Sequence, residues 1–239
     1  MFGVPKSLSI VNKINVFVTN DRNKKKYKVV IAPPFTLLES FSKIFKKKAV
    51  DIGAQNCFYK NLFSSDTGAI SPYMIKNIGA NYVIIGHSDN RAEGDTSKIL
   101  KDKLIFALKN NLKVIFCIGE NKSEKNSHKT NMVLKRQLIR VLDKKLNKNN
   151  LIIAYEPIWS IGTGKIPDHT TLVKTSKFIK FTLNQIFKSK KPIPVLYGGS
   201  VDSSNISQFR TILDIDGFLI GGASKSYQNF IDIIKNYYR

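Results

Sequence analysis

Residues 151–165 read LIIAYEPIWSIGTGK, and the interpretation of the whole chain starts from this stretch. It begins with an apolar run that is typical of a strand covered on both faces of a parallel sheet. A carboxylate, Glu156, follows at the carboxyl end of the run, where parallel sheets and barrels place their active sites. Pro157 stiffens the exit, while Gly162 and Gly164 permit tight turns. The stretch therefore predicts a candidate general base followed by a mobile lid with rigid ends.

Further apolar runs of strand length alternate with longer amphipathic stretches, which is typical of βα units and a parallel sheet. The expected strands are Lys28–Ala32, Val50–Gly53, Tyr82–Gly86, Val114–Ile118, Leu151–Tyr155, Pro194–Tyr197 and Gly217–Ile220, and the clearest helices are Lys129–Leu146, Leu172–Phe187 and Ser224–Tyr237. A closed parallel barrel needs eight strands, whereas we find seven, and the chain begins with a helix. From pattern alone, an open doubly wound sheet is the alternative.

Composition predicts one globular domain over residues 1–239. Apolar residues make up 42% and charged residues 23% of the chain, and no apolar run approaches the roughly 20 residues that cross a bilayer. An α/β barrel commonly has this length as a single unit. The two cysteines, Cys57 and Cys117, offer neither a disulfide framework nor metal-ligand spacing. We therefore expect a cytoplasmic protein without a metal, and without a membrane partner.

The formal net charge of +22 is the unusual property of this sequence. Lysines are scattered, with clusters at 24–26, 46–48 and 144–145. Nucleic-acid binding is one interpretation of such charge. The clusters lack interleaved aromatic residues, however, so we favour a solvated lysine-rich surface over a nucleic-acid partner. The charge would still speed the encounter with an anionic substrate.

Three other polar or glycine-rich segments follow strand runs. His87 comes directly after Tyr82–Gly86, although a single histidine is more often structural than catalytic. Two glycine pairs, Gly198-Gly199 and Gly221-Gly222, follow the last two strands, where barrels often bind phosphate through backbone N–H groups. Each pair taken alone is equally consistent with a plain turn.

Together these segments resemble the triosephosphate isomerase family. Residues 155–165 are similar to the family signature Y-E-P-[VI]-W-A-I-G-T-G-K. The other matching segments occur in family order and are Gly53–Asn56, Ile85–Ser88, Cys117–Glu120, Tyr197–Val201 and Asp216–Ser224. The likeness extends over residues 5–239. It implies a TIM (β/α)₈ barrel and an isomerase of triose phosphates that uses no cofactor.

The resemblance also implies residue roles. Glu156 would move a proton between neighbouring carbons of dihydroxyacetone phosphate, giving glyceraldehyde 3-phosphate, while a neutral His87 polarises the carbonyl; this arrangement is taken over from the family itself. The remaining implied site residues are Gly162, Ser200, Gly221 and Gly222 for the phosphate, and Ser88, Asp89, Cys117, Glu120, Trp159 and Tyr197 in support. Asp89 stands where the family has Glu. The resemblance further implies a homodimer formed through the Cys57–Pro72 loop.

The main departure from the family lies at the start of the chain. The family opens with a short strand that ends in N-W-K-M, and its Asn and Lys line the site. Met1 aligns with the Met of that pattern, so this strand, the Asn and the Lys are not in the sequence. Either Met1 is a misplaced start, which we favour, or the product is short. We expect seven strands and impaired activity in the chain as written, and a non-catalytic barrel that binds phosphate ligands is the alternative function.

A second departure concerns the lid. Pro167 occupies a position where closed-lid family members offer a backbone N–H to the tyrosine that corresponds to Tyr197. Because proline has no N–H, that hydrogen bond must be missing or replaced in this chain.

Overall fold

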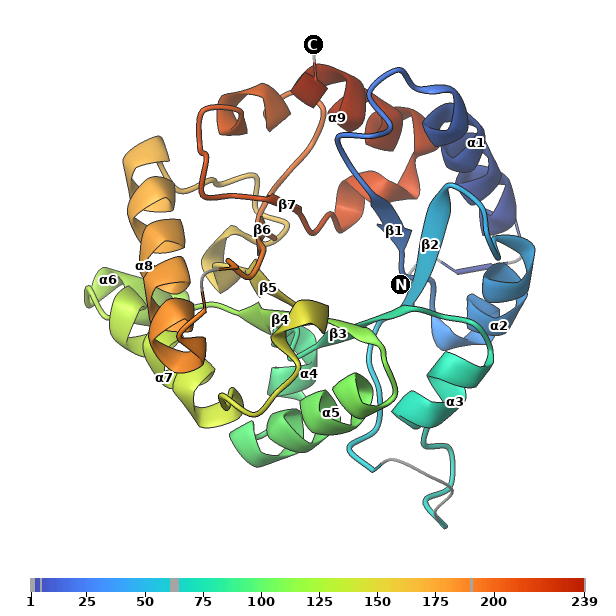
Figure 1. Ribbon diagram of the computed structural model, residues 1–239. Helices are drawn as coiled ribbons and strands as arrows, with labels where there is room; N and C mark the ends of the chain where they lie inside the picture. Colours follow the sequence, from blue (N-terminus) through green and yellow to red (C-terminus); the bar gives the residue numbers. More distant parts are fainter. Residues whose placement is uncertain (1–2, 5, 61–64, 190, 239) are drawn as a thin grey trace.

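A parallel sheet curls into a barrel at the centre of the molecule, with helices around it (Figure 1). The computed structural model describes residues 3–4, 6–60, 65–189 and 191–238, so Met1 lies outside the described residues. In this part of the chain the sheet has seven strands in the order β1 to β7, and each pairs in parallel with the next one along the sequence. A doubly wound sheet reverses its strand order at a switch point. The unbroken order excludes that alternative and establishes a TIM-barrel fold.

The predicted strands are confirmed to within two residues at each end. Their near-continuous apolar runs are typical of strands buried on both faces, and here the surrounding helices provide that burial. Gly217–Ile220 shortens most, to two residues. The strands are β1 (Val29–Ile31), β2 (Val50–Ala54), β3 (Tyr82–Ile85), β4 (Lys113–Ile118), β5 (Leu151–Tyr155), β6 (Val195–Tyr197) and β7 (Gly217–Phe218).

Helices connect the strands and cover the barrel from outside. The α-helices are α1 (Ser7–Asn20), α2 (Phe35–Ile44), α3 (Pro72–Asn77), α4 (Ser88–Ala92), α5 (Ser97–Lys109), α6 (Lys122–Asn126), α7 (Thr130–Val141), α8 (His169–Phe187) and α9 (Tyr227–Tyr238). Short 3₁₀ helices are η1 (Lys148–Asn150), η2 (Ile158–Ser160), η3 (Ile206–Phe209) and η4 (Gly222–Lys225).

Two predicted helices are shorter than expected, whereas α8 is longer and begins at His169, three residues before the predicted Leu172. The helix expected to reach Leu146 ends at Val141, because the backbone of Leu142 is extended with ψ of 143° and Asp143 accepts a hydrogen bond from the N–H of Lys145. The helix expected from residue 224 begins at Tyr227, after η4. In both places local hydrogen bonds from short polar side chains interrupt a helical apolar spacing.

The core has two parts because side chains alternate along each strand. In β4, Val114, Phe116 and Ile118 pack outward against the helices. Ile115 and Cys117 point the other way and pack inside the barrel, together with Tyr82 and Ala154. Both cysteines are free and buried, which fits their expected role as small hydrophobic groups.

The first and last strands each pair on one side only within the described residues. The outer layer nevertheless closes across this position, where α1 and α9 lie side by side (Figure 1). The Tyr27 and Tyr238 rings stack with centroids 5.3 Å apart, and the Lys13 ammonium lies 4.1 Å from the centroid of the Tyr227 ring. Helix packing therefore joins the two ends of the chain without strand pairing.

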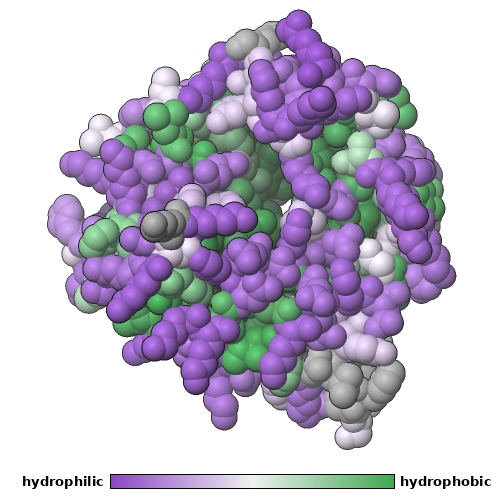
Figure 2. Space-filling view, in the orientation of Figure 1, coloured by the Kyte–Doolittle hydropathy of each residue, from purple (hydrophilic) through white to green (hydrophobic). Residues whose placement is uncertain are grey.

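The face in Figure 2 is covered largely by hydrophilic residues, with apolar residues visible in patches between them. The lysines of the clusters at 24–26, 46–48 and 144–145 are exposed, which agrees with a solvated lysine-rich surface. None of the helices in the described ranges combines the length and the apolar composition needed to cross a membrane.

We predict that Ile14→Ala lowers the free energy of unfolding by about 2–5 kcal/mol, because it leaves a cavity where α1 packs on the barrel. Ile14 is only 1% exposed. Val16 on the same helix is 59% exposed, so Val16→Ala should change stability by less than about 0.5 kcal/mol. Denaturant unfolding of both variants measures the difference, and equal losses would contradict this packing of α1.

Candidate active site

Glu156 follows β5 and is buried, with 4% of its surface exposed. Its N–H donates to the carbonyl of Ile118 at the end of β4 (2.7 Å). A Cβ at Gly119 would lie 1.8 Å from the Glu156 carbonyl oxygen, and one at Gly198 would lie 2.7 Å from its Cγ. Gly119 therefore leaves room for the Glu156 backbone, and Gly198 leaves room for its side chain.

Burial raises the pKa of Glu156 above its ordinary value, because removal from water disfavours the ionised form. His87, the Cys117 thiol and Arg91 lower this pKa by smaller amounts. The Oε2 atom of Glu156 is buried and has no hydrogen-bond partner among the described residues. A carboxylate with an unused, desolvated oxygen is suited to accept a proton from a ligand.

His87 follows β3, which β4 separates from β5, and it precedes α4. Its Nδ1 accepts a hydrogen bond from the N–H of Asp89 (3.2 Å). An Nδ1 that accepts carries no proton, so this bond favours the neutral tautomer with its proton on Nε2. That Nε2 lies 3.6 Å from Oε1 of Glu156. The imidazole thus presents an N–H donor beside the carboxylate.

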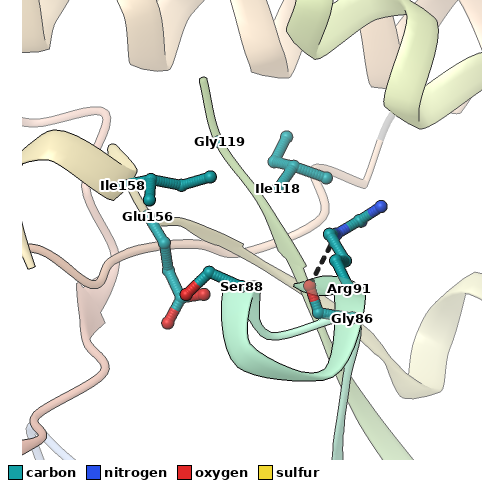
Figure 3. Close-up of a pocket in the computed structure, with 7 residues that line it drawn as sticks. All are labelled: Gly86, Ser88, Arg91, Ile118, Gly119, Glu156 and Ile158. Carbon is teal, nitrogen blue, oxygen red and sulfur yellow. Dashed lines mark hydrogen bonds between the residues drawn. The ribbon is translucent and has the colours of Figure 1, made fainter. Parts of the chain in front are cut away.

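A small cavity adjoins Glu156, and Figure 3 shows the carboxylate extending toward Ser88 at the start of α4. Arg91 points away and fixes the two strand ends, because its Nε donates to the Gly86 carbonyl (2.7 Å) and its Nη2 to the Cys117 carbonyl (2.8 Å). The cavity of about 10 Å³ has room for at most about one water. Its lining residues are Gly86, Ser88, Arg91, Ile118, Gly119, Glu156 and Ile158.

The lid begins at η2 and is anchored by Glu120. The Glu120 carbonyl accepts from the N–H of Ile158 (3.0 Å), and its Oε1 accepts from the Trp159 indole (2.9 Å) and the Tyr155 hydroxyl (3.2 Å). Burial raises the pKa of Glu120, and the Trp159 and Tyr155 hydrogen bonds oppose this rise. The Lys125 ammonium lies 3.3 Å from the centroid of the Trp159 ring, a cation–π contact on the same anchor.

The far end of the lid contacts the segment after β6. Gly164 donates its N–H to Oγ of Ser200 (3.1 Å). Gly162 and Gly164 have φ of +67° and +73°, a conformation that favours glycine. The hydrogen bond expected to be missing at Pro167 is replaced, because the Tyr197 hydroxyl pairs with Oγ of Ser160 (3.1 Å).

The second glycine pair follows β7, next to the segment after β6. Gly222 starts η4, and the Gly221 carbonyl accepts from the N–H (3.0 Å) and hydroxyl (2.6 Å) of Ser224. A Cβ at either glycine would meet nothing within 4 Å, so both backbones are open to a ligand. The recorded contacts do not join this pair to Glu156, and its part in the site stays a prediction.

Contacts therefore connect most of the predicted site residues, namely His87, Ser88, Asp89, Cys117, Glu120, Glu156, Trp159, Tyr197 and Ser200. Sequence reasoning missed Arg91, Lys125 and Gln137. The Gln137 amide both donates to and accepts from the backbone of Gly119 (2.9 Å each). In the described residues, no three His, Cys, Asp or Glu side chains lie close enough together to hold a metal ion.

The sequence matches the family model described as "Triosephosphate isomerase" over residues 5–237. The chain belongs to the triosephosphate isomerase family. The yeast triosephosphate isomerase of Saccharomyces cerevisiae is 41% identical over 213 residues, covering 87% of this chain and 84% of the yeast enzyme. That of Dictyoglomus thermophilum is 36% identical over 228 residues, covering 93% and 91%.

A solved structure gives the same family. The crystal structure of triosephosphate isomerase from Bartonella henselae superposes with a TM-score of 0.90 and 32% identity, covering 100% of this chain and 96% of that one. Triosephosphate isomerases are therefore similar to this chain in sequence over most of its length and in fold over all of it.

We predict that Glu156→Gln stabilises this family member at neutral pH. Because burial raises the pKa of Glu156 in the folded state, the folded wild type holds more protons than the unfolded chain above the ordinary value of 4.5. Wild-type stability therefore falls, relative to the variant, as the pH rises from there through the raised pKa. Thermal unfolding at about pH 4 and about pH 7.5 measures this, and an advantage that grew on acidification would refute it.

Proposed function

We propose that this chain interconverts dihydroxyacetone phosphate and glyceraldehyde 3-phosphate by proton transfer through an enediolate. Membership of the triosephosphate isomerase family supports the reaction. The observation that carries the proposal is the buried Glu156 carboxylate, whose Oε1 lies 3.6 Å from Nε2 of His87 at one end of the barrel. A protein that only bound phosphate would need no such base.

Glu156 removes the proton from the carbon next to the carbonyl and returns it to the neighbouring carbon. An exposed carboxylate is a weak base for a carbon acid, and burial raises its pKa toward the operating pH. The partnerless Oε2 supplies the accepting oxygen. Desolvation by burial is thus the main source of base strength in this proposal.

His87 donates from Nε2 to the carbonyl oxygen as negative charge develops there, and then passes protons between the two oxygens of the enediolate. A fixed donor aimed at the developing charge needs no reorganisation during the reaction. The bond from the Asp89 N–H to Nδ1 holds the ring in the orientation and tautomer that this role requires.

The backbone N–H groups of Gly162, Ser200 and Gly222 bind the substrate phosphate, with Gly221 allowing close approach. Support comes from the contact of Gly164 with Ser200 and from the open glycine backbones after β7. Closure of the lid excludes water and strengthens each electrostatic contact with the substrate. It also retains the enediolate until the second proton transfer.

Glu156→Gln should lower kcat by about 10²–10⁴-fold, because it removes the general base without changing the shape of the side chain. The matched control is Glu93→Gln on an exposed residue near the same strand ends, which should leave kcat unchanged. A coupled assay of glyceraldehyde 3-phosphate formation measures both variants. Wild-type protein that bound the triose phosphate without turning it over would instead support a non-catalytic phosphate-binding barrel.

We further propose a single-domain chain that acts in the cytoplasm as a homodimer. The Cys57–Pro72 loop would form the dimer contact, although residues 61–64 lie outside the described residues. At the base of the loop, the Phe58 N–H donates to the Ile70 carbonyl (2.8 Å), and Lys60 and Asp66 form an ion pair (2.7 Å). The free cysteines fit a reducing compartment.

An eighth strand between β7 and β1, carrying an Asn and a Lys into the site, is the remaining part of the fold proposal. Its support is that both strands have an unpaired edge within the described residues, and exposed edges are normally paired or covered. A chain preceded by a short apolar strand ending in Asn-Trp-Lys should be about 10²–10³-fold more active than residues 1–239 alone. Equal rates in the same assay would contradict this.

A further inference from the structure

The hydroxyl of Ser160 lies where the lid meets the end of β6, and its residue is fully buried at 0% exposure. Ser160 Oγ donates to the Lys165 carbonyl (2.5 Å). It also contacts the Tyr197 hydroxyl (3.1 Å) and the N–H of Ser200 (3.4 Å). A serine hydroxyl offers one donor and two acceptor positions, and these three contacts use all of them.

The backbone carbonyl of Ser160 makes a further hydrogen bond to the segment after β6. The Ser160 carbonyl accepts from the Ser200 hydroxyl (2.7 Å), and Ser200 Oγ in turn accepts from the Gly164 N–H (3.1 Å). The hydroxyl and carbonyl of Ser160 thus connect the start of the lid, its far end and the segment after β6. These contacts link residues up to 40 positions apart in sequence, so they are tertiary in origin.

The neighbouring residues make this serine hard to replace. Tyr197 is buried at 0% exposure, and within the described part of the chain its hydroxyl hydrogen-bonds only to Ser160. The nearby Pro167 is buried and has no N–H to offer. The family signature has alanine at the position of Ser160, so a residue without a hydroxyl would leave the Tyr197 hydroxyl buried and unpaired here.

Glycine at position 199 leaves room for the contact between Ser160 and Tyr197. A Cβ at Gly199 would lie 2.1 Å from the Tyr197 hydroxyl oxygen and 2.6 Å from Ser160 Oγ. Only glycine lets the two hydroxyls meet at this point. A buried serine without a specific partner would not require glycine at position 199, which lies 39 residues later in the sequence.

We propose that Ser160 is a positioning residue that latches the lid closed over the substrate. Its hydroxyl ties the Lys165 carbonyl to Tyr197 and Ser200, and so fixes the N–H groups of Ser200 and the lid around the phosphate. The inference rests on the proposed isomerase function and assigns the lid a fastening that is particular to this chain. Ser160 itself touches neither Glu156 nor the reacting carbons.

Loss of the Ser160 contacts should be measurable as release of inorganic phosphate from the reaction intermediate. When the lid opens on the enediolate, the electrons of its carbon–carbon double bond form a new double bond to the phosphate-bearing carbon, and the bond from that carbon to the phosphate oxygen breaks. The bonding pair leaves with inorganic phosphate, and the remaining three-carbon enol-aldehyde tautomerises to methylglyoxal. The released phosphate therefore counts the turnovers in which the lid failed. A serine that only stabilised the fold would not change this fraction.

The test compares Ser160→Ala with Ser176→Ala. Ser176 is also a buried serine, 2% exposed, whose hydroxyl donates to a carbonyl, that of Leu172 (2.7 Å), but within its own helix. Ser160→Ala should lower kcat about 10-fold, the effect of losing a buried hydrogen bond or two, and raise the fraction of turnovers that release phosphate at least several-fold. Ser176→Ala should change neither. Losing a buried hydroxyl lowers stability in both variants, so both are assayed well below their melting temperatures.

A double-mutant cycle with Tyr197→Phe completes the test, because residues that act through one contact give non-additive effects. The double variant should be no slower than the slower single variant. Wild-type kcat and phosphate release in Ser160→Ala, or multiplying losses in the cycle, would overturn the latch. Lack of isomerase activity in the wild type would instead overturn the proposed function.

Discussion

The burial of one carboxylate is the constraint on which the rest of this structure depends. Glu156 sits at the end of β5 with 4% of its surface exposed, and burial raises its pKa. Such a group is unfavourable in the folded state at neutral pH unless nearby groups support its charge. Here His87, the Cys117 thiol and Arg91 provide that support only in part. The part of the desolvation cost that these groups do not offset makes Glu156 a stronger base, which the proposed reaction uses. Burial of Glu156 therefore lowers stability at neutral pH while it favours activity.

The barrel makes this burial possible because parallel strands bring their carboxyl ends to one face. Glu156 and His87 come from β5 and β3, which are separated by β4. The end of β4 lies between them, and Gly119 there lets the Glu156 backbone approach closely by having no Cβ. Gln137 and Arg91 bind the backbone of the same strand end. These contacts restrict movement of the end of β4, although none of the three residues is a proposed catalytic group.

Local sequence patterns predicted the strands and the positions of Glu156 and His87 directly after them, whereas the roles of the site residues were implied by the family resemblance. A buried parallel strand is an apolar run, and a polar side chain directly after it must emerge at the face where the strands end. The contacts around Ser160, Arg91 and Gln137 were not predictable in this way, since each residue also has a partner that lies 18 to 40 residues away. The end of α7 was missed for a different reason, because Leu142 and Leu146 continue the helical spacing although Leu142 has an extended backbone.

The proposed base, Glu156, and the lid are adjacent in the sequence, so movement of the lid can change the surroundings of the base. Glu156 is separated from Ile158 by a single proline, and Glu120 binds both the Ile158 N–H and the Trp159 indole. A lid that rotated about this anchor would carry the backbone next to the carboxylate with it. Opening would then rehydrate the carboxylate and weaken it as a base, while closure would do the reverse. In the proposed function, the segment 156–165 would therefore link water exclusion to base strength, and strong basicity would be confined to the state in which the substrate is enclosed.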